Sequence, residues 1–143
     1  MQRQKGFSII ELLLVVAIIG IISSIAIPNL ISSRRAARES SAIGTMRALS
    51  AAQAAYITSY GGQSQYGAMS DLIAVQLIDS SLVSSSRNTY SFQITQSSPS
   101  SFAVTATPTS DASTMRHFYS DETGVIRENL GATATAASSP ISR

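Results

Sequence analysis

Hydrophobic side chains are concentrated in one block near the beginning of the chain. Residues 7–27 read FSIIELLLVVAIIGIISSIAI, and no polar side chain interrupts the run from Leu12 to Ile22. An α-helix rises about 1.5 Å per residue, so this segment is long enough to cross a hydrocarbon core of about 30 Å. The pattern predicts a membrane-spanning helix over residues 7–28.

Beyond this block the helical pattern continues and becomes amphipathic. Pro28 inside a helix costs about 3 kcal/mol, so we expect it to kink or locally open the helix. An amphipathic half is predicted over residues 29–60, ended by Gly61-Gly62. One stripe at three- to four-residue spacing is expected to contact the rest of the domain. Its members are Ala42, Met46, Leu49, Gln53, Tyr56 and Tyr60.

The remaining residues change from helical to strand-like periodicity. Residues 61–88 form a connecting region with one short helix, for which Ser70 is the expected cap. Residues 89–130 carry the period-two alternation of strands: 90–95 and 102–107 predict one antiparallel hairpin, and 117–119 with 125–127 predict a second pair. Residues 131–143, GATATAASSPISR, have few core-forming side chains, and we expect a mobile tail there.

Three kinds of N-terminal segment fit the apolar block. In a secretory signal peptide, Arg3 and Lys5 would precede the apolar run and Ser24-Ile25-Ala26 would be the cleavage site. In a permanent anchor, the helix would stay attached to the domain. In the third kind, the chain would be cut before the apolar run and not after it.

Glu11 favours the third interpretation. A carboxylate inside an apolar membrane helix costs about 2.5–3.5 kcal/mol near the bilayer centre, and such residues are typically paired. Neither a signal peptide nor an anchor needs this residue. Cleavage between Gly6 and Phe7 would create a partner, because a neighbouring subunit could present its Phe7 amine to the Glu11 carboxylate. Desolvation cancels much of the gain from such a pair, so we expect it to set the stagger between subunits.

The segment KGFSIIELL at residues 5–13 closely resembles the class III signal of type IV pilins and type II secretion pseudopilins. A basic residue before Gly6, Phe7 after it and Glu11 at the fifth mature position are all present. Gly20 and Pro28 fall where this family has a helix-loosening Gly and Pro. The match covers residues 5–31, roughly a fifth of the chain.

The resemblance implies a fold and a life cycle. The expected fold is α+β: a long N-terminal helix, with a small antiparallel sheet packed on its C-terminal half. A prepilin peptidase would remove the leader, residues 1–6, and methylate Phe7. Through Phe7 and Glu11, an inner-membrane assembly platform would then join copies into a helical filament. The precursor would lie in the bacterial inner membrane, in contact with lipid, and the assembled form would be an extracellular surface filament.

The amino-acid composition limits the kinds of site that this chain can contain. Charged residues make up only 13% of the 143 residues, a thin charge cover that suits packing against copies of the same chain. The absence of cysteine excludes structural disulfides, thiol nucleophiles and metal–thiolate sites. The net charge is +2, and removal of Arg3 and Lys5 would leave 8 basic and 8 acidic residues. The basic pI is therefore no sign of a nucleic-acid partner.

No residue pattern predicts catalysis or a cofactor. The single histidine, His117, falls in a predicted strand without a Ser or Cys motif beside it, and is interpreted as structural. Asp111, Asp121 and Glu122 could contribute to a weak calcium site, but their spacing fits no dedicated calcium loop, so we expect solvated turn carboxylates and no metal. We expect no enzyme.

Three arginines follow the membrane segment: Arg34, Arg35 and Arg38. They are expected to meet lipid headgroups or acidic side chains of neighbouring subunits. No aromatic platform or second basic stripe accompanies them, so nucleic-acid binding is not expected.

We therefore expect a structural subunit of a type IV pilus filament, serving attachment or motility. Two alternatives stay open: a pseudopilin of a type II secretion system, and a minor pilin or non-polymerising membrane-anchored binding module. Long extracellular fibres at native expression would argue against the pseudopilin. Low abundance relative to a second pilin would favour the minor pilin.

Overall fold

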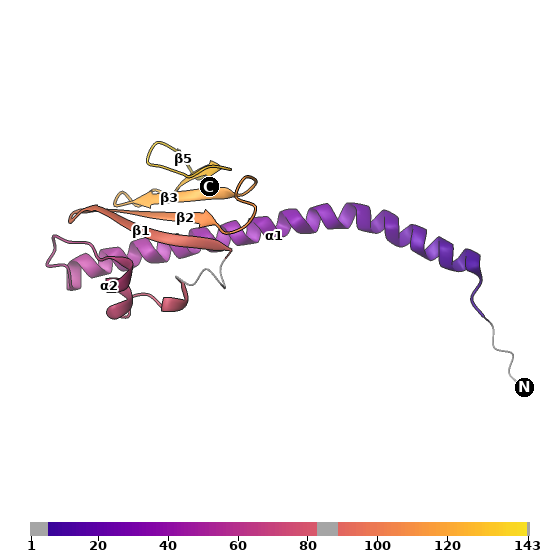
Figure 1. Cartoon of the computed structure of the whole chain (residues 1–143), viewed down its shortest axis with the longest axis horizontal. Helices are drawn as coiled ribbons and strands as arrows, with labels where there is room; N and C mark the ends of the chain where they lie inside the picture. The colour runs from indigo at the N-terminus through magenta and orange to yellow at the C-terminus, as the bar shows by residue number, and fades with distance from the viewer. Residues whose placement is uncertain (1–5, 83–88, 143) are drawn as a thin grey trace, which may run out of the picture. The chain divides into compact units, whose positions relative to one another are not determined.

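The computed structural model describes residues 6–82 and 89–142, and has the expected α+β architecture (Figure 1). The predicted leader therefore lies outside the described residues except for Gly6, as does the last part of the connecting region. The elements in chain order are α1 (Ile9–Ser59), α2 (Met69–Ala74), the 3-10 turn η1 (Ser80–Leu82), β1 (Tyr90–Ser98), β2 (Ser101–Pro108), β3 (Arg116–Asp121), β4 (Arg127–Leu130) and β5 (Ser139–Pro140). The chain divides into two compact units, one ending at Ala37 and the other beginning at Arg38.

The N-terminal unit consists of the first part of α1. Its large apolar side chains are all exposed, from Ile9, 77% exposed, to Ile31, 55% exposed. By length and composition this is the one described helix that could cross a membrane. The helix continues without a break through Gly20 and Pro28. The Ser24 hydroxyl donates to the Ile21 carbonyl at 2.7 Å, one turn before Pro28.

The C-terminal unit contains an antiparallel meander in the order β1-β2-β3-β4-β5. In the first hairpin, Phe92 lies opposite Ala106 and Ile94 opposite Val104. The second predicted pair is also present, with Tyr119 opposite Arg127. Residues of β2 are alternately half-buried and buried along its whole length, which is the period-two signal read from the sequence. The first predicted strand pair is confirmed. The second pair is also present, but β4 begins at Arg127, so Val125 and Ile126 lie before the strand and not in it.

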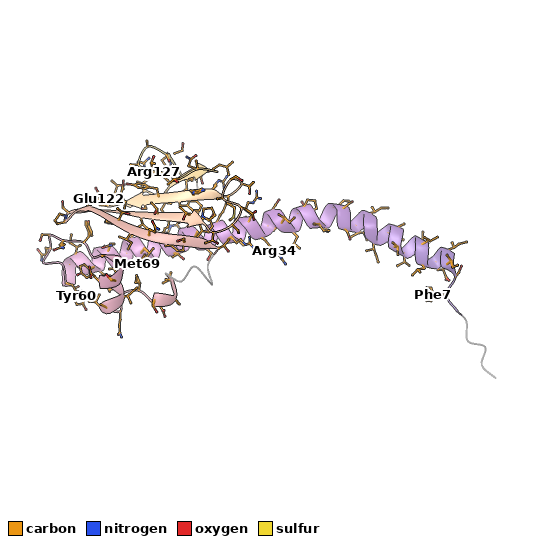
Figure 2. The ribbon with its side chains drawn as sticks, viewed as in Figure 1. Phe7, Arg34, Tyr60, Met69, Glu122 and Arg127 are labelled. Atoms are coloured by element: carbon orange, nitrogen blue, oxygen red, sulfur yellow. The ribbon has the colours of Figure 1, made fainter. Side chains whose placement is uncertain are left out.

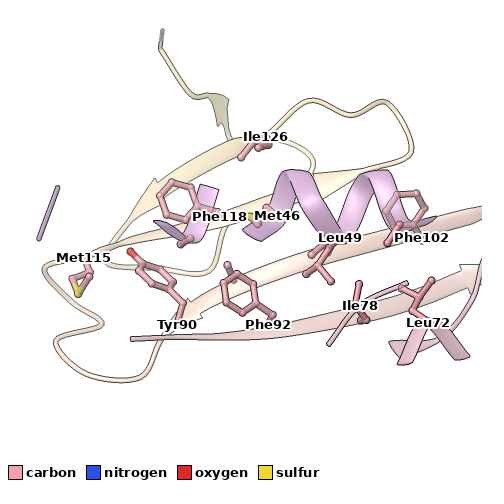
Figure 3. Packing of buried hydrophobic residues seen from close by; sticks show 14 residues of the cluster. Met46, Leu49, Leu72, Ile78, Tyr90, Phe92, Phe102, Met115, Phe118 and Ile126 are labelled. Atoms are coloured by element: carbon pink, nitrogen blue, oxygen red, sulfur yellow. The ribbon is translucent and has the colours of Figure 1, made fainter. Parts of the chain in front are cut away.

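One face of this sheet packs on the second part of α1 to form the core (Figure 3). Helix residues Met46 and Leu49 are almost completely buried, as are Val104 and Phe118 from the sheet. Figure 3 shows these two helix side chains beside aromatic rings that project from the strands. The Tyr90 and Phe118 rings lie 5.7 Å apart in a tilted arrangement, a geometry that aromatic pairs favour.

The predicted contact stripe of α1 ends earlier than expected. Four of its members, Ala42, Met46, Leu49 and Gln53, are buried. Tyr56 is only half-buried, and Tyr60 is 57% exposed because α1 already ends at Ser59. The chain then turns through Gly62 and Gln63, both at positive φ. Such a left-handed exit is a common way to end a helix.

The connecting region is held by a side chain from the core of α1. The Gln53 amide donates to the Gly67 carbonyl at 2.7 Å and accepts the Gly67 N–H at 3.1 Å. The short helix α2 follows at once, and its cap is Ala68 and not the expected Ser70. The Asp71 carboxylate, rather than the Ser70 hydroxyl, accepts the Ala68 N–H at 2.8 Å.

The last residues differ from the mobile tail expected for 131–143. Within this segment, β5 pairs with β4, and the Ile141 N–H donates to the Ile126 carbonyl at 3.0 Å. The Arg127 guanidinium donates to the Ser138 carbonyl at 3.0 Å, and Ala134 is buried. Backbone pairing, the small buried side chain of Ala134 and the partly buried Ile141, which packs against the core, attach this segment to the sheet. Few large apolar residues are needed for this attachment, and their scarcity led to the expectation of a tail.

Removing residues 132–143 should therefore destabilise the domain. The truncation loses the β5 pairing, the Arg127–Ser138 hydrogen bond and the burial of Ala134. At about 0.5–1.5 kcal/mol per hydrogen bond, we expect a loss of about 1–3 kcal/mol. Thermal unfolding of the full-length and truncated chains in detergent would measure it.

A point variant inside the same segment provides the control. The Thr133 side chain is exposed, and only its backbone carbonyl, which a substitution retains, accepts a hydrogen bond from Asn129. Thr133→Ala should therefore unfold close to the wild-type temperature. Equal melting temperatures for the wild type, this variant and the truncated chain would contradict the prediction.

Candidate assembly site at the N-terminus of α1

The residues around the predicted cleavage point lie outside the helix. Gly6, Phe7 and Ser8 are not helical, and α1 begins at Ile9. Phe7 is 84% exposed, the largest exposed fraction among the large hydrophobic residues of the described chain (Figure 2). The Gly6–Phe7 bond therefore lies in accessible chain, as a peptidase substrate requires.

Glu11 occupies the first turn of α1 and binds the helix start. Its Oε2 accepts the Ser8 N–H at 3.0 Å, while the Ser8 hydroxyl accepts the Ile10 N–H at 3.3 Å. The Ser8 carbonyl accepts the Leu12 N–H at 3.2 Å. This is a capping box, in which two backbone donors that the helix leaves free are bound by side chains.

The capping box was missed in the sequence, although its signal is present there. Ser8 and Glu11 form the S-x-x-E pattern directly before an apolar run, and that pattern is a helix N-terminus signature. The structure thus gives Glu11 a partner inside its own chain, without any cleavage. This hydrogen bond exists beside the pairing that cleavage between Gly6 and Phe7 would permit. A carboxylate in the first turn is also favoured by the helix dipole.

The capping box leaves part of the carboxylate available. Only Oε2 of Glu11 accepts a hydrogen bond from residues that the structure describes, and the side chain is exposed. A carboxylate accepts several hydrogen bonds at once, so Glu11 can cap its own helix and still bind a second donor.

Glu39, which follows the three arginines in the sequence, forms an ion pair with a residue of the sheet. Arg34 and Arg38 are exposed and Arg35 is half-buried. Glu39 forms an ion pair with Arg116 on β3, at 3.1 Å, and Arg116 also contacts Glu128 on β4 at 3.4 Å. The Glu39 carboxylate thus joins the second part of α1 to the sheet.

The candidate metal ligands have other roles or lie apart. The Asp121 carboxylate accepts the Thr123 N–H at 3.1 Å and stabilises the turn after β3. Within residues 6–82 and 89–142, no group of three His, Asp or Glu side chains is placed to hold a metal ion. The His117 ring is nearly buried, with Nε2 3.2 Å from the Ala112 carbonyl oxygen, which is a structural contact. Asp111 is exposed, as is Glu122.

On the central strand β3, the surroundings of Tyr119 alter its acidity. Burial raises the pKa of the Tyr119 hydroxyl, and the negative charges of Asp121 and Glu122 raise it further, while Arg127 opposes them. The hydroxyl therefore stays protonated across the physiological range. No reactive group results.

The chain matches known proteins in its N-terminal part. Residues 1–27 match the family model described as the prokaryotic N-terminal methylation motif. By this segment, the chain is similar to type IV pilins and to core proteins of type II secretion systems. The matched residues include the predicted cleavage point, Glu11 and the first part of α1.

Curated relatives share the same part of the chain. The chain is 45% identical over 56 residues to the type IV major pilin protein PilA of Myxococcus xanthus, covering 39% of this chain and 26% of the relative. It is 53% identical over 47 residues to the type IV major fimbrial protein FimA of Dichelobacter nodosus (31% and 30%). It is 35% identical over 52 residues to the type II secretion system core protein G of Klebsiella pneumoniae (36% and 37%).

These matches leave most of the chain without a counterpart. The matched region spans between about a quarter and about two fifths of the length of these relatives. No solved structure matches the chain. The sheet and its connections are therefore known from the structure of this chain, and not from its relatives.

Proposed function

We propose that this protein is the structural subunit of a type IV pilus, which polymerises through its N-terminal helix. The observation that carries the proposal is that all large apolar side chains in the first part of α1 are exposed, while its first turn carries a carboxylate. An apolar surface of this length is stable in lipid, or when bundled with identical helices. Relatives named as major pilin and major fimbrial proteins support the filament role.

The proposed life cycle begins with an inner-membrane precursor. A prepilin peptidase cleaves between Gly6 and Phe7 and methylates the new amine. An assembly platform then moves subunits from lipid into the filament. Lipid already solvates the apolar helix, so bundling inside the bilayer gains little hydrophobic energy. Once outside the membrane, burial of apolar surface at about 25 cal/mol per Å² holds the helices together.

In this proposal, Gly20 loosens the helix and Pro28 weakens it locally. Pro28 lacks the N–H that would bind the Ser24 carbonyl, so one backbone hydrogen bond of α1 is missing there. Gly20 has open space around its α-carbon, which permits close approach of a neighbouring helix. The role is structural and not enzymatic, and needs no cofactor.

A second candidate is the pseudopilin of a type II secretion system. The relatives named core protein G of that system support it. Both candidates share processing and helix-mediated assembly, and differ in the length and location of the fibre. The major pilin and fimbrial relatives favour the pilus.

N-terminal mass spectrometry of protein recovered from fibres sheared off intact cells tests the proposal. The expected result is a chain that begins at N-methylated Phe7. A chain beginning at Ile27 would indicate an ordinary signal peptide, and the proposal would fail. Processed protein found only in the membrane fraction would instead favour the pseudopilin.

A further inference from the structure

Two charged side chains bracket the apolar part of α1. Residues 12–33 contain no charged side chain, and Glu11 precedes this run while Arg34 follows it. At about 1.5 Å per residue the run is about 33 Å long, slightly more than a hydrocarbon core of about 30 Å. Figure 2 shows Phe7 and Arg34 toward opposite ends of this exposed stretch. A bilayer around the run therefore has one of these charged residues at each of its surfaces.

Arg34 lies at the depth of the lipid headgroups. The last large apolar residue of the run is Ile31, and Arg34 follows it by about 4.5 Å along the helix. The headgroup layer outside the hydrocarbon core is about 5–7 Å thick on each side. In a helix the Cα–Cβ bonds tilt toward the N-terminus, which here directs the Arg34 side chain back toward the membrane. Its guanidinium is thus within reach of lipid phosphates.

The guanidinium of Arg34 is available for a ligand. It is exposed and has no hydrogen-bond or ion-pair partner among residues 6–82 and 89–142. Arg35, which is half-buried and also interacts within its own chain, adds a second positive charge beside it. The nearest acidic residue in the sequence, Glu39, already forms an ion pair with Arg116. A negatively charged group from outside the chain therefore meets uncompensated positive charge at Arg34.

We propose that Arg34, with Arg35 beside it, binds the phosphate of an anionic phospholipid in the membrane-inserted form of the protein. The inference rests on the membrane precursor of the function proposed above. An arginine binds a phosphate through two parallel N–H···O hydrogen bonds. A headgroup such as phosphatidylglycerol carries no positive charge of its own, so it is preferred over phosphatidylcholine. The contact fixes the depth of the helix in the bilayer and is lost when the subunit leaves the membrane.

Lipid titration measures this preference. The full-length chain is purified in mild detergent and titrated with phosphatidylglycerol or phosphatidylcholine, and native mass spectrometry counts the bound lipids. Arg34→Gln should lower the affinity for phosphatidylglycerol about fivefold, because one basic residue near an anionic lipid surface contributes about that factor. The affinity for phosphatidylcholine should change less. Equal phosphatidylglycerol affinities of the wild type and Arg34→Gln would overturn the proposal.

Two further variants show whether the position of the charge matters. Arg47→Gln removes the same charge from another exposed position of α1, far beyond the apolar run, and should leave lipid binding unchanged. Arg34→Lys keeps the charge but not the paired donors, so it should lose less affinity than Arg34→Gln. Glutamine and arginine have similar helix propensities, so both glutamine variants should keep the helix. An equal loss of affinity from Arg47→Gln would show attraction by net charge alone and would overturn the site.

Cysteine labelling tests the depth of Arg34 independently of affinity. The chain contains no cysteine, so each introduced thiol is the only one. In vesicles that contain phosphatidylglycerol, a charged maleimide that does not cross lipid should label Ala37→Cys quickly and Ile27→Cys hardly at all. Ser33→Cys, next to Arg34, should react more slowly than Ala37→Cys because it lies among the headgroups. Equal labelling rates at positions 33 and 37 would place Arg34 in water and overturn the proposal.

The outcomes separate the lipid site from the pilus function. A chain that stays in membranes after alkaline washing, but binds both lipids equally well, would overturn the lipid site and leave the pilus function intact. A chain that alkaline washing removes from membranes would overturn the membrane precursor, and the lipid site with it.

Discussion

Glu11→Gln is expected to abolish fibre formation while the protein remains in the membrane. Glutamine retains an oxygen that can accept the Ser8 N–H, so the capping box at the start of α1 can persist. The variant loses only the negative charge that would bind a neighbouring Phe7 amine. We expect at least a tenfold lower fibre yield, with an unchanged amount of protein in the membrane fraction. Sheared-fibre yield and membrane immunoblots measure the two quantities.

Two further variants separate pairing from helix capping. Glu11→Ala removes the charge and the cap, at a capping cost of about 0.5–2 kcal/mol, and should also prevent assembly without preventing membrane insertion. Ser8→Ala removes the hydroxyl that accepts the Ile10 N–H and leaves the charge, so near-normal fibre yield is expected. Normal yield from Glu11→Gln, with loss of fibres from Ser8→Ala, would show that capping is the function of this carboxylate.

Gln53→Leu is expected to destabilise the C-terminal unit more than any exposed substitution. Leucine has a similar size but cannot bind Gly67, whose N–H and carbonyl both pair with the buried Gln53 amide. A buried polar group without a partner costs about 1–3 kcal/mol, so the loss of both pairs should cost about 2–5 kcal/mol. For a domain of about 100 residues, each kcal/mol lowers the melting temperature by about 4–8 °C. Thermal unfolding followed by circular dichroism in detergent measures the change.

A neighbouring glutamine provides the control for this prediction. The Gln65 side chain is exposed and lies in the same connecting region, so Gln65→Leu should change the melting temperature by little. If the two variants unfold at the same temperature, the Gln53–Gly67 hydrogen bonds do not hold the connecting region. Protease sensitivity of residues 61–68 should rise in Gln53→Leu alone, because that segment loses its attachment to α1.

Local patterns were enough to predict the secondary structure of most of this chain. The helix and both hairpins follow from periodicity, since each side chain's position on a helix or strand depends on its immediate neighbours. The residues at which helices end were less predictable from the sequence. Tyr60 falls on the correct stripe of α1 by spacing, but the helix ends one residue earlier, and its ring is mostly exposed. Spacing alone does not reveal where a helix stops.

The candidate site at the start of α1 was proposed from the sequence, although its hydrogen bonds were not. Gly6, Phe7 and Glu11 were named from the residue pattern, and residues 1–27 match the methylation motif. The hydrogen bonds between Ser8, Ile10 and Glu11 are seen only in the structure. The free-energy cost of a carboxylate in an apolar helix gives no hint that Ser8, three residues away, supplies a backbone donor to Glu11.

By itself, the sequence determined the apolar helix, the carboxylate in its first turn and the strand pairs, because each depends on residues close together in the chain. Tertiary structure decided which polar side chains hold the domain together. Gln53 meets Gly67 across 14 residues, and Glu39 meets Arg116 across 77. It also decided that residues 131–142 join the sheet, through β5 and the buried Ala134. Such contacts depend on which segments fold side by side, and the composition of a single segment contains no information about its neighbour in space.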